Sequence, residues 1–286
     1  MLECVPNLAA GRDQAALAVL ADACGATLLD LHTDRDHHRS VFTLAGPGPA
    51  DAAVVMTELA RVAAARVSIV GHQGAHPRLG VLDVVPFVSL DEPAEQAKAA
   101  AQAFGRWLAA TFEVPVFFYG AADPDARTLP AVRAEAFSAR SPDVGPGGPH
   151  PRLGASAVGA RPPLVAVNCW LDRDDVTLAR TLARSVRARD GGLPGVRALG
   201  LPLVSRGQAQ VSMNVTDLAA TGVEAACTAV RAGAEAAGAQ VERVEWVGLL
   251  PDAEVARCSP TFRAWSGLDH SLTVEARLAE PRRGSG

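Results

Sequence analysis

The chain has 286 residues, of which 49% are hydrophobic and 20% are charged, a balance that is typical of globular proteins and excludes an intrinsically disordered one. Its formal net charge of −4 excludes a strongly basic nucleic-acid surface. No stretch interleaves Lys or Arg with aromatic residues as a single-strand binder does. We therefore expect no nucleic-acid partner.

The sequence also indicates a compartment. No apolar run reaches the roughly 20 residues that cross a bilayer. The first residues, MLECVPNL, have neither the basic region nor the long apolar segment of a signal peptide. The five cysteines are scattered without a CxxC pair, which favours reduced, buried thiols over a disulfide framework or a zinc ribbon. We expect a cytoplasmic protein without a membrane partner.

Short apolar runs alternate with longer helical patterns, which favours a layered α/β or α+β architecture over a β-sandwich or a helical bundle. In the first half, strands are predicted at residues 2–5, 27–31, 40–45 and 114–119. Helices are predicted at residues 12–24, from the GPGP turn at 46–49 through about residue 64, and from a start near residues 91–93. The last of these carries Ala97, Ala101, Phe104 and Leu108 at helical spacing.

Residues 141–163 are rich in proline and glycine and predict either a long structured loop or the seam between two lobes. After them, strands are predicted at residues 164–169, 196–201, 208–214 and 244–249, and helices at 174–187 and 218–236. This βαββαβ order suits a ferredoxin-like unit, and the first half reads as an enlarged version of it. We predict an α+β fold of two subdomains, residues 1–162 and 163–286, with mixed β-sheets and helices packed on them.

The first candidate for chemistry is GHQGAHPRLGVLDVVPF, residues 71–87, whose glycines and prolines exclude a regular helix. His72 and His76 are therefore not the helical pair of a zinc protease, and the glutamate of an HExxH motif is missing. On such a loop, His76 can exchange protons near neutral pH beside Arg78 and Asp83. The alternative is that His76 caps a turn while Arg78 pairs with Asp83.

A second segment, HTDRDHHRS at residues 32–40, combines histidines with aspartates, which are common metal ligands. A metal-dependent hydrolase would draw its ligands from His32, Asp34, Asp36 and His37. The segment has no fixed helical or strand spacing, which favours a solvated connection between two strands.

Two further segments carry polar or flexible residues. The glycines of residues 145–161 can bring backbone N–H groups to an anion or a ring, or form a plain linker. HPRLG occurs in residues 76–80 and again in 150–154. The repeat is either a coincidence or a sign that the two loops share the same chemistry. Residues 208–217 predict an alternating strand with one polar face, which meets solvent or a cleft. That face would carry Gln208, Gln210, Ser212 and Asn214.

Taken in order, these segments resemble the formiminotransferase domain of glutamate formiminotransferase. The matching stretches include ECVPN at 3–7, the HPRLG segment with residues 83–87, PVFFYG at 115–120, VGAR at 158–161, AQVSMN at 209–214 and VGLLP at 247–251. Their order and spacing make the match specific along most of the chain.

The resemblance implies two ferredoxin-like subdomains that hold folate in a groove between them, and a homodimer. It also implies a reaction, the transfer of a formimino group from N-formimino-L-glutamate to N5 of tetrahydrofolate in histidine degradation and one-carbon metabolism. Tetrahydrofolate is the co-substrate, and no metal is expected. The catalytic general acid and base is then His76 of the HPR motif, for which we expect a near-neutral pKa.

The same resemblance assigns residues to the two substrates. The folate-binding loop comprises Gly145, Pro146, Gly147, Gly148, His150, Arg152 and Gly154. Arginine forks match carboxylates, so substrate contacts are expected at Arg39, Arg78 and Arg161, and further ones at Gln210 and Asn214.

Some positions depart from the family pattern. The pattern SEGR is replaced at Ala9 and Ala10, HNRS at His38, and GEHPR at Ala75. Loss of the carboxylate beside His76 is expected to change its orientation or its pKa. The alternative is a folate-binding relative that is non-catalytic or uses a formyl donor.

Overall fold

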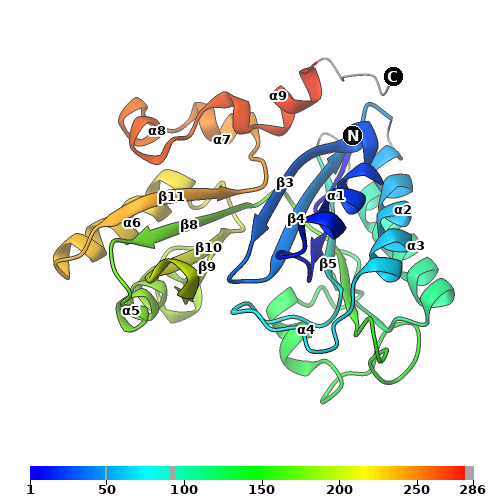
Figure 1. Ribbon diagram of the computed structural model, residues 1–286. Helices are drawn as coiled ribbons and strands as arrows, with labels where there is room; N and C mark the ends of the chain where they lie inside the picture. Colours follow the sequence, from blue (N-terminus) through cyan, green and yellow to red (C-terminus); the bar gives the residue numbers. More distant parts are fainter. Residues whose placement is uncertain (49, 91–93, 281–286) are drawn as a thin grey trace. The chain divides into compact units, whose positions relative to one another are not determined.

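The computed structural model describes residues 1–286 except 49, 91–93 and 281–286 (Figure 1). It divides into two compact units, Met1–Pro162 and Pro163–Glu280. Each unit packs helices on a β-sheet around its own apolar core, which is the α+β fold predicted from the sequence. In the part of the chain that the structure describes, no helix has both the length and the hydropathy to span a bilayer.

The sheet of the first unit combines parallel and antiparallel strands. Its order is β1-β4-β2-β5-β7-β6, with β3 paired to β4. β7 pairs parallel with both β5 and β6. β1 and β2 pair antiparallel with both β4 and β5, and β3 pairs antiparallel with β4. The strands are β1 (Leu2–Cys4), β2 (Asn7–Leu8), β3 (Leu28–Asp34), β4 (Arg39–Ala45), β5 (Leu82–Ser89), β6 (Val116–Gly120) and β7 (Ser156–Ala160).

Helices cover both faces of this sheet. One face packs against α1 (Gln14–Asp22), α2 (Asp51–Arg66) and α3 (Ala94–Phe112), which share a core with the strands. α4 (Leu129–Glu135) contributes Val132 to a second, smaller core. The Asp13 side chain caps α1 by accepting the Ala16 N–H, so this helix begins later than predicted. The predicted start at 91–93 lies outside the described residues.

The second unit has the predicted order βαββαβ. Its elements are β8 (Val165–Leu171), α5 (Val176–Val186), β9 (Val196–Leu203), β10 (Gln208–Val215), α6 (Val223–Ala236) and β11 (Val241–Val247). The sheet order β11-β8-β10-β9 is antiparallel throughout, and α5 and α6 share one core with it. This is the ferredoxin-like arrangement. α6 begins five residues later than the predicted residue 218, because Asp217 closes a turn by accepting the Ala220 N–H.

Short helices follow β11 that the sequence patterns did not predict. They are α7 (Asp252–Ala256), α8 (Pro260–Ser266) and α9 (Val274–Ala279), and brief 3-10 turns occur at Gly25–Thr27, Ala188–Asp190, Val204–Arg206 and His270–Leu272. α8 packs on β11, where the rings of Trp246 and Phe262 meet edge to face at 6.4 Å. One or two turns of helix give too little periodicity to be recognised in a sequence.

Two strands occupy segments that were predicted as loops. The segment 71–87 becomes β5 from Leu82 onward, and the segment 141–163 contains β7. β5 is buried on both faces, so it lacks alternation, and Pro86 argues against a strand. β7 consists of small residues, SAVGA, and lies between β5 and β6. Both strands belong to the parallel part of the sheet.

The two HPRLG pentapeptides lie side by side. The Val81 N–H donates to Leu153 O over 2.9 Å, and the Ala155 N–H donates to Leu79 O over 3.0 Å. Each pentapeptide ends in a glycine, and these glycines, Gly80 and Gly154, lie opposite each other where the two segments meet. Gly154 has a φ of +73°. The two copies therefore share a structural role in the loops, because they join the 150–154 segment to the end of the loop that carries His76.

Gly154→Ala is expected to destabilise the first unit by at least about 1 kcal/mol more than Gly71→Ala. A Cβ at Gly154 would lie 2.4 Å from Leu79 O, whereas at Gly71, with a similar φ of +69°, it meets nothing within 4 Å. Amide hydrogen exchange in β5 measures the difference, and equal losses in the two variants would contradict a requirement for close approach.

Candidate functional site

Asp83 lies where β5 carries one extra residue against β2. Asn7 pairs with Val84 and Leu8 pairs with Leu82, which leaves Asp83 outside this register. Such a bulge re-aims a side chain and is common beside active sites. The Asp83 side chain is fully buried, and its carboxylate faces two guanidinium groups.

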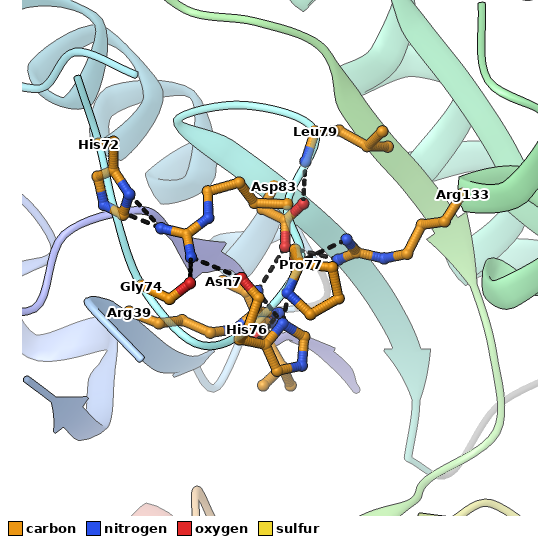
Figure 2. A network of polar contacts seen from close by, with 11 residues as sticks. Asn7, Arg39, His72, Gly74, His76, Pro77, Leu79, Asp83 and Arg133 are labelled. Carbon is orange, nitrogen blue, oxygen red and sulfur yellow. Dashed lines mark hydrogen bonds and ion pairs between the residues drawn. The ribbon is translucent and has the colours of Figure 1, made fainter. Parts of the chain in front are cut away.

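These groups belong to Arg39 and Arg133 (Figure 2). Asp83 Oδ2 accepts hydrogen bonds from Arg39 Nη1 and from Arg133 Nη2, the second over 2.6 Å, while Oδ1 accepts the Leu79 N–H over 2.7 Å. Burial opposes the ionisation of Asp83, but the charges of the two arginines hold its pKa below the usual value. One carboxylate thus pairs with two cations, so Asp83, Arg39 and Arg133 together carry a net positive charge.

Arg39, the first residue of β4, is held in place by Asn7. Asn7 Oδ1 accepts from Arg39 Nε over 3.1 Å and from Nη2 over 2.7 Å, and its own amide donates to Val5 O over 2.9 Å. The Arg39 side chain is only 14% exposed. Its Nη1 lies 3.4 Å from Nδ1 of His76, so Asn7 fixes the guanidinium beside the imidazole.

His76 is partly buried, and its imidazole contacts the backbone of the next residue (Figure 2). Its Nδ1 lies 2.8 Å from the carbonyl oxygen of Pro77. Because a carbonyl oxygen only accepts, we assign the ring proton to Nδ1 from this contact. The lone pair of the neutral imidazole is then on Nε2, which is the nitrogen that can take up a proton.

The electrostatic surroundings of His76 differ from the prediction. Burial, followed by the charge of Arg39, lowers its pKa to about 3, so the predicted near-neutral pKa is wrong. Burial also lowers the pKa of His72 to about 4 and lowers that of His38, whose ring centroid lies 3.9 Å from that of His72. At neutral pH, His72 and His76 are therefore uncharged.

These depressed pKa values predict how acid affects stability. An unfolded histidine takes up a proton near pH 6.5, whereas folded His72 and His76 do so only near pH 4 and 3. The stability contributed by the neutral rings is therefore complete above pH 6.5 and is lost as the pH falls towards 3. Hydrogen exchange in β5 is expected to show this loss, with a shallower slope in His76→Gln. The same slope in both proteins would contradict the prediction.

Arg78 organises the loop and does not pair with Asp83 as the turn-capping alternative required. Its Nη2 donates to the carbonyl oxygens of Gly74 over 2.8 Å and His76 over 2.5 Å, and its Nη1 contacts the ring of His72. That predicted ion pair is wrong, because Asp83 pairs with Arg39 and Arg133. Arg78 instead closes the turn that precedes Pro77.

The histidine-rich segment 32–40 forms the end of β3, a turn and the start of β4. Asp34 accepts the His37 N–H over 2.7 Å and closes this turn. Across residues 1–280, apart from 49 and 91–93, no group of three or more His, Cys, Asp or Glu side chains is placed to hold a metal. The turn instead borders a small recess lined by Ala9, His37, His38, Arg39, His76, Arg78 and Asp83.

The predicted folate loop divides into two parts. Gly145, Pro146, Gly147 and Gly148 are exposed to solvent. In the second part, His150 Nδ1 accepts the N–H groups of Arg152 and Leu153, and Gly154 packs against Leu79. The Arg152 side chain donates to Val67 O over 2.9 Å and also to Ala64 O, which caps the end of α2. The side chains of His150 and Arg152 are thus engaged within the first unit.

The other predicted substrate contacts lie elsewhere in the fold. Arg161 directly follows β7, and its side chain donates to Pro162 O over 3.0 Å. Gln210 and Asn214 belong to β10 of the second unit, on the predicted polar face; Gln210 is fully buried and Asn214 is exposed. The structure thus brings Arg39 and Arg78 to His76, and places Gln210 and Asn214 in a different unit.

Two residues of the site were not predicted. Asn7 belongs to the matching stretch ECVPN, but no sequence pattern indicates that its amide holds Arg39. Arg133 lies on α4, which was itself not predicted, and only tertiary packing brings it to Asp83. An isolated Asn or Arg carries no local signal for such a role.

The sequence matches known families and proteins over most of its length. The family model of the formiminotransferase domain, N-terminal subdomain, matches residues 1–161, and that of the formiminotransferase domain matches residues 166–265. Glutamate formimidoyltransferase of Streptococcus pyogenes is 34% identical over 88% of this chain and 89% of its own length. The protein of that name from Thermoplasma acidophilum is 30% identical over 97% of both chains.

The mouse formimidoyltransferase-cyclodeaminase is 33% identical over 88% of this chain, which covers 50% of the mouse protein. The two family models together match nearly all of the first unit and most of the second. Because the family models and these relatives cover most of the chain, including the loop of His76 and the network around Asp83, the chain belongs to the formiminotransferase domain family of transferases, as its resemblance predicted.

Proposed function

We propose that the chain transfers a formimino group from N-formimino-L-glutamate to N5 of tetrahydrofolate, a step of histidine degradation. The observation that carries the proposal is the neutral imidazole of His76, fixed on the HPR loop of a family member with its lone pair on Nε2. The names of the relatives, glutamate formimidoyltransferase and formimidoyltransferase-cyclodeaminase, support this reaction.

His76 serves as base and then as acid in this proposal. Its Nε2 accepts the proton that N5 loses as N5 bonds to the formimino carbon, and a tetrahedral intermediate results. The imidazolium then returns that proton to the glutamate nitrogen, whose bond to the formimino carbon breaks. The products are formimino-folate and free glutamate, so the proton is conserved and no further reactant is needed.

The surplus positive charge around His76 suits anionic substrates. Arg39, Arg133 and Arg78 contribute three guanidinium groups, and Asp83 pairs with two of them. Burial is the largest cause of the low pKa of His76, and the charge of Arg39 is the second. A substrate carboxylate bound beside Arg39 and Arg78 would offset the second cause and make the imidazole a stronger base. Binding of the correct substrate thus raises the proton affinity of His76 before the imidazole accepts the proton of N5.

The remaining contacts are assigned within the same proposal. Folate binds the exposed backbone of Gly145, Pro146, Gly147 and Gly148, while the 150–154 segment supports the His76 loop. Arg39 and Arg78 line the recess and meet a substrate carboxylate, and further contacts come from Arg161, Gln210 and Asn214. The protein acts in the cytoplasm as a homodimer, for which light scattering after gel filtration is the test.

The test combines an assay with a binding measurement. Purified protein with tetrahydrofolate and formiminoglutamate is expected to produce the absorbance of 5-formiminotetrahydrofolate, and tetrahydrofolate alone is expected to raise the melting temperature. A raised melting temperature without product would favour the folate-binding relative, which the low pKa of His76 supports. Product from a formyl donor alone would indicate altered specificity.

A further inference from the structure

Arg133 reaches from α4 to the His76 loop and to the start of β5 (Figure 2). Its Nη2 pairs with Asp83 Oδ2 over 2.6 Å, and its Nη1 donates to the carbonyl oxygen of Pro77 over 3.0 Å. Its side chain is only 16% exposed. The guanidinium therefore bridges a buried carboxylate on β5 and the backbone of the HPR motif.

The carbonyl that Arg133 holds is the one that His76 contacts. The oxygen of Pro77 lies 2.8 Å from His76 Nδ1 and 3.0 Å from Arg133 Nη1. A carbonyl oxygen has two lone pairs and can accept from both groups at once. Arg133 thus fixes the position of the acceptor towards which the imidazole directs its ring proton.

A second arginine, Arg39, would require the same nitrogen to accept a hydrogen bond instead of donating one. Arg39 Nη1 lies 3.4 Å from His76 Nδ1, and a guanidinium can only donate. If Nδ1 accepted this bond, the ring proton would be on Nε2, and no lone pair would remain there. Arg39 is in turn held by Asn7 and Asp83, so it cannot withdraw freely.

We propose that Arg133 is a positioning residue that selects the catalytic tautomer of His76. It holds the Pro77 carbonyl as the acceptor for the Nδ1 proton, whereas the contact with Arg39 would favour the tautomer with its proton on Nε2. The inference rests on the proposed role of His76. Arg133 acts through Pro77 and has no contact with the reacting atoms in this scheme. Its bidentate bridge is what a lysine, with one ammonium group, cannot reproduce.

Nuclear magnetic resonance of protein labelled with ¹⁵N-histidine reads the tautomer directly. In the wild type, His76 is expected to show a protonated Nδ1 and an unprotonated Nε2, with the signals identified by their loss in His76→Gln. In Arg133→Met the two assignments are expected to exchange. The matched control is Arg127→Met, which removes an arginine that pairs with Asp123 and Asp125 and should leave the tautomer unchanged.

A conservative variant covers the case in which Arg133→Met does not fold. Arg133→Lys keeps the charge beside Asp83 but cannot span both acceptors, so a mixture of tautomers is expected. A wild-type tautomer in Arg133→Met, or in Arg133→Lys if only that variant folds, would overturn the proposal. So would a wild-type protein whose Nδ1 is unprotonated.

Kinetics provide the second readout. Loss of the bridge is expected to lower kcat by about 10–100-fold with little change in KM, because Arg39 and Arg78 still meet the substrate carboxylate while the base is misoriented. A kcat within twofold of wild type would overturn the proposal. If the wild type transfers no formimino group, the tautomer experiment still decides the role of Arg133, so failure of the proposed function is distinguishable from failure of this inference.

Discussion

Replacing His76 with alanine is expected to lower kcat/KM for formimino transfer by about 10²–10⁴-fold, the usual contribution of a general acid or base. The expected loss follows from the assignment of both proton transfers to Nε2 of this ring. His76→Asn should be equally impaired, because an amide can still donate to Pro77 O but cannot exchange a proton. Steady-state assays with formiminoglutamate and tetrahydrofolate measure both variants.

The matched control is His270→Ala, which removes an exposed histidine of the second unit that pairs with Asp252. It is expected to retain full activity. The melting temperature of His76→Ala should stay near that of the wild type, because the ring is only partly buried. A folded His76→Ala that keeps more than about a tenth of the wild-type kcat/KM would contradict the assignment of His76 as the acid and base.

Asp83→Asn is expected to lower the free energy of unfolding of the first unit by about 3–5 kcal/mol, the cost of breaking a buried ion pair by removing one partner. The neutral amide leaves Arg39 and Arg133 with like charges and without the carboxylate between them. Activity should fall as well, because both arginines position the groups around His76. Amide hydrogen exchange in β5 gives the stability of this unit separately.

The comparison for this variant is Asp125→Asn, because Asp125 also pairs with an arginine, Arg127, but has a side chain that is 64% exposed. Exposed ion pairs contribute only about 0–1 kcal/mol, so this change should have little effect. Similar losses in the two variants would show that the Asp83 network does not stabilise the first unit more than a surface pair does.

The second unit could be predicted from the sequence because its patterns are local. β10 alternates apolar residues with polar ones, and α5 and α6 carry apolar residues at helical spacing. The first unit was harder, because β5 is buried on both faces and interrupted by Pro86, and β7 contains only small residues. Neither strand shows the period of two that identifies a half-buried strand.

The residues of the site also divide into those that local sequence predicts and those that depend on tertiary structure. His76, Arg39 and Arg78 lie in recognisable stretches, and the structure brings them together. The position of Asp83 depends on a bulge that only strand pairing reveals, and that of Arg133 depends on the packing of a helix of two turns. The pKa of His76 depends on burial and on Arg39, so residue type alone gave the wrong value.

The most direct measurement follows the formimino carbon itself. Formiminoglutamate labelled with ¹³C at that carbon is incubated with tetrahydrofolate and the purified chain. We predict that the label appears on N5 of the folate, that one glutamate is released for each labelled product, and that His76→Ala abolishes both within the time of the assay. Glutamate release without labelled folate, or no reaction by a folded wild type that binds tetrahydrofolate, would contradict the proposed transfer.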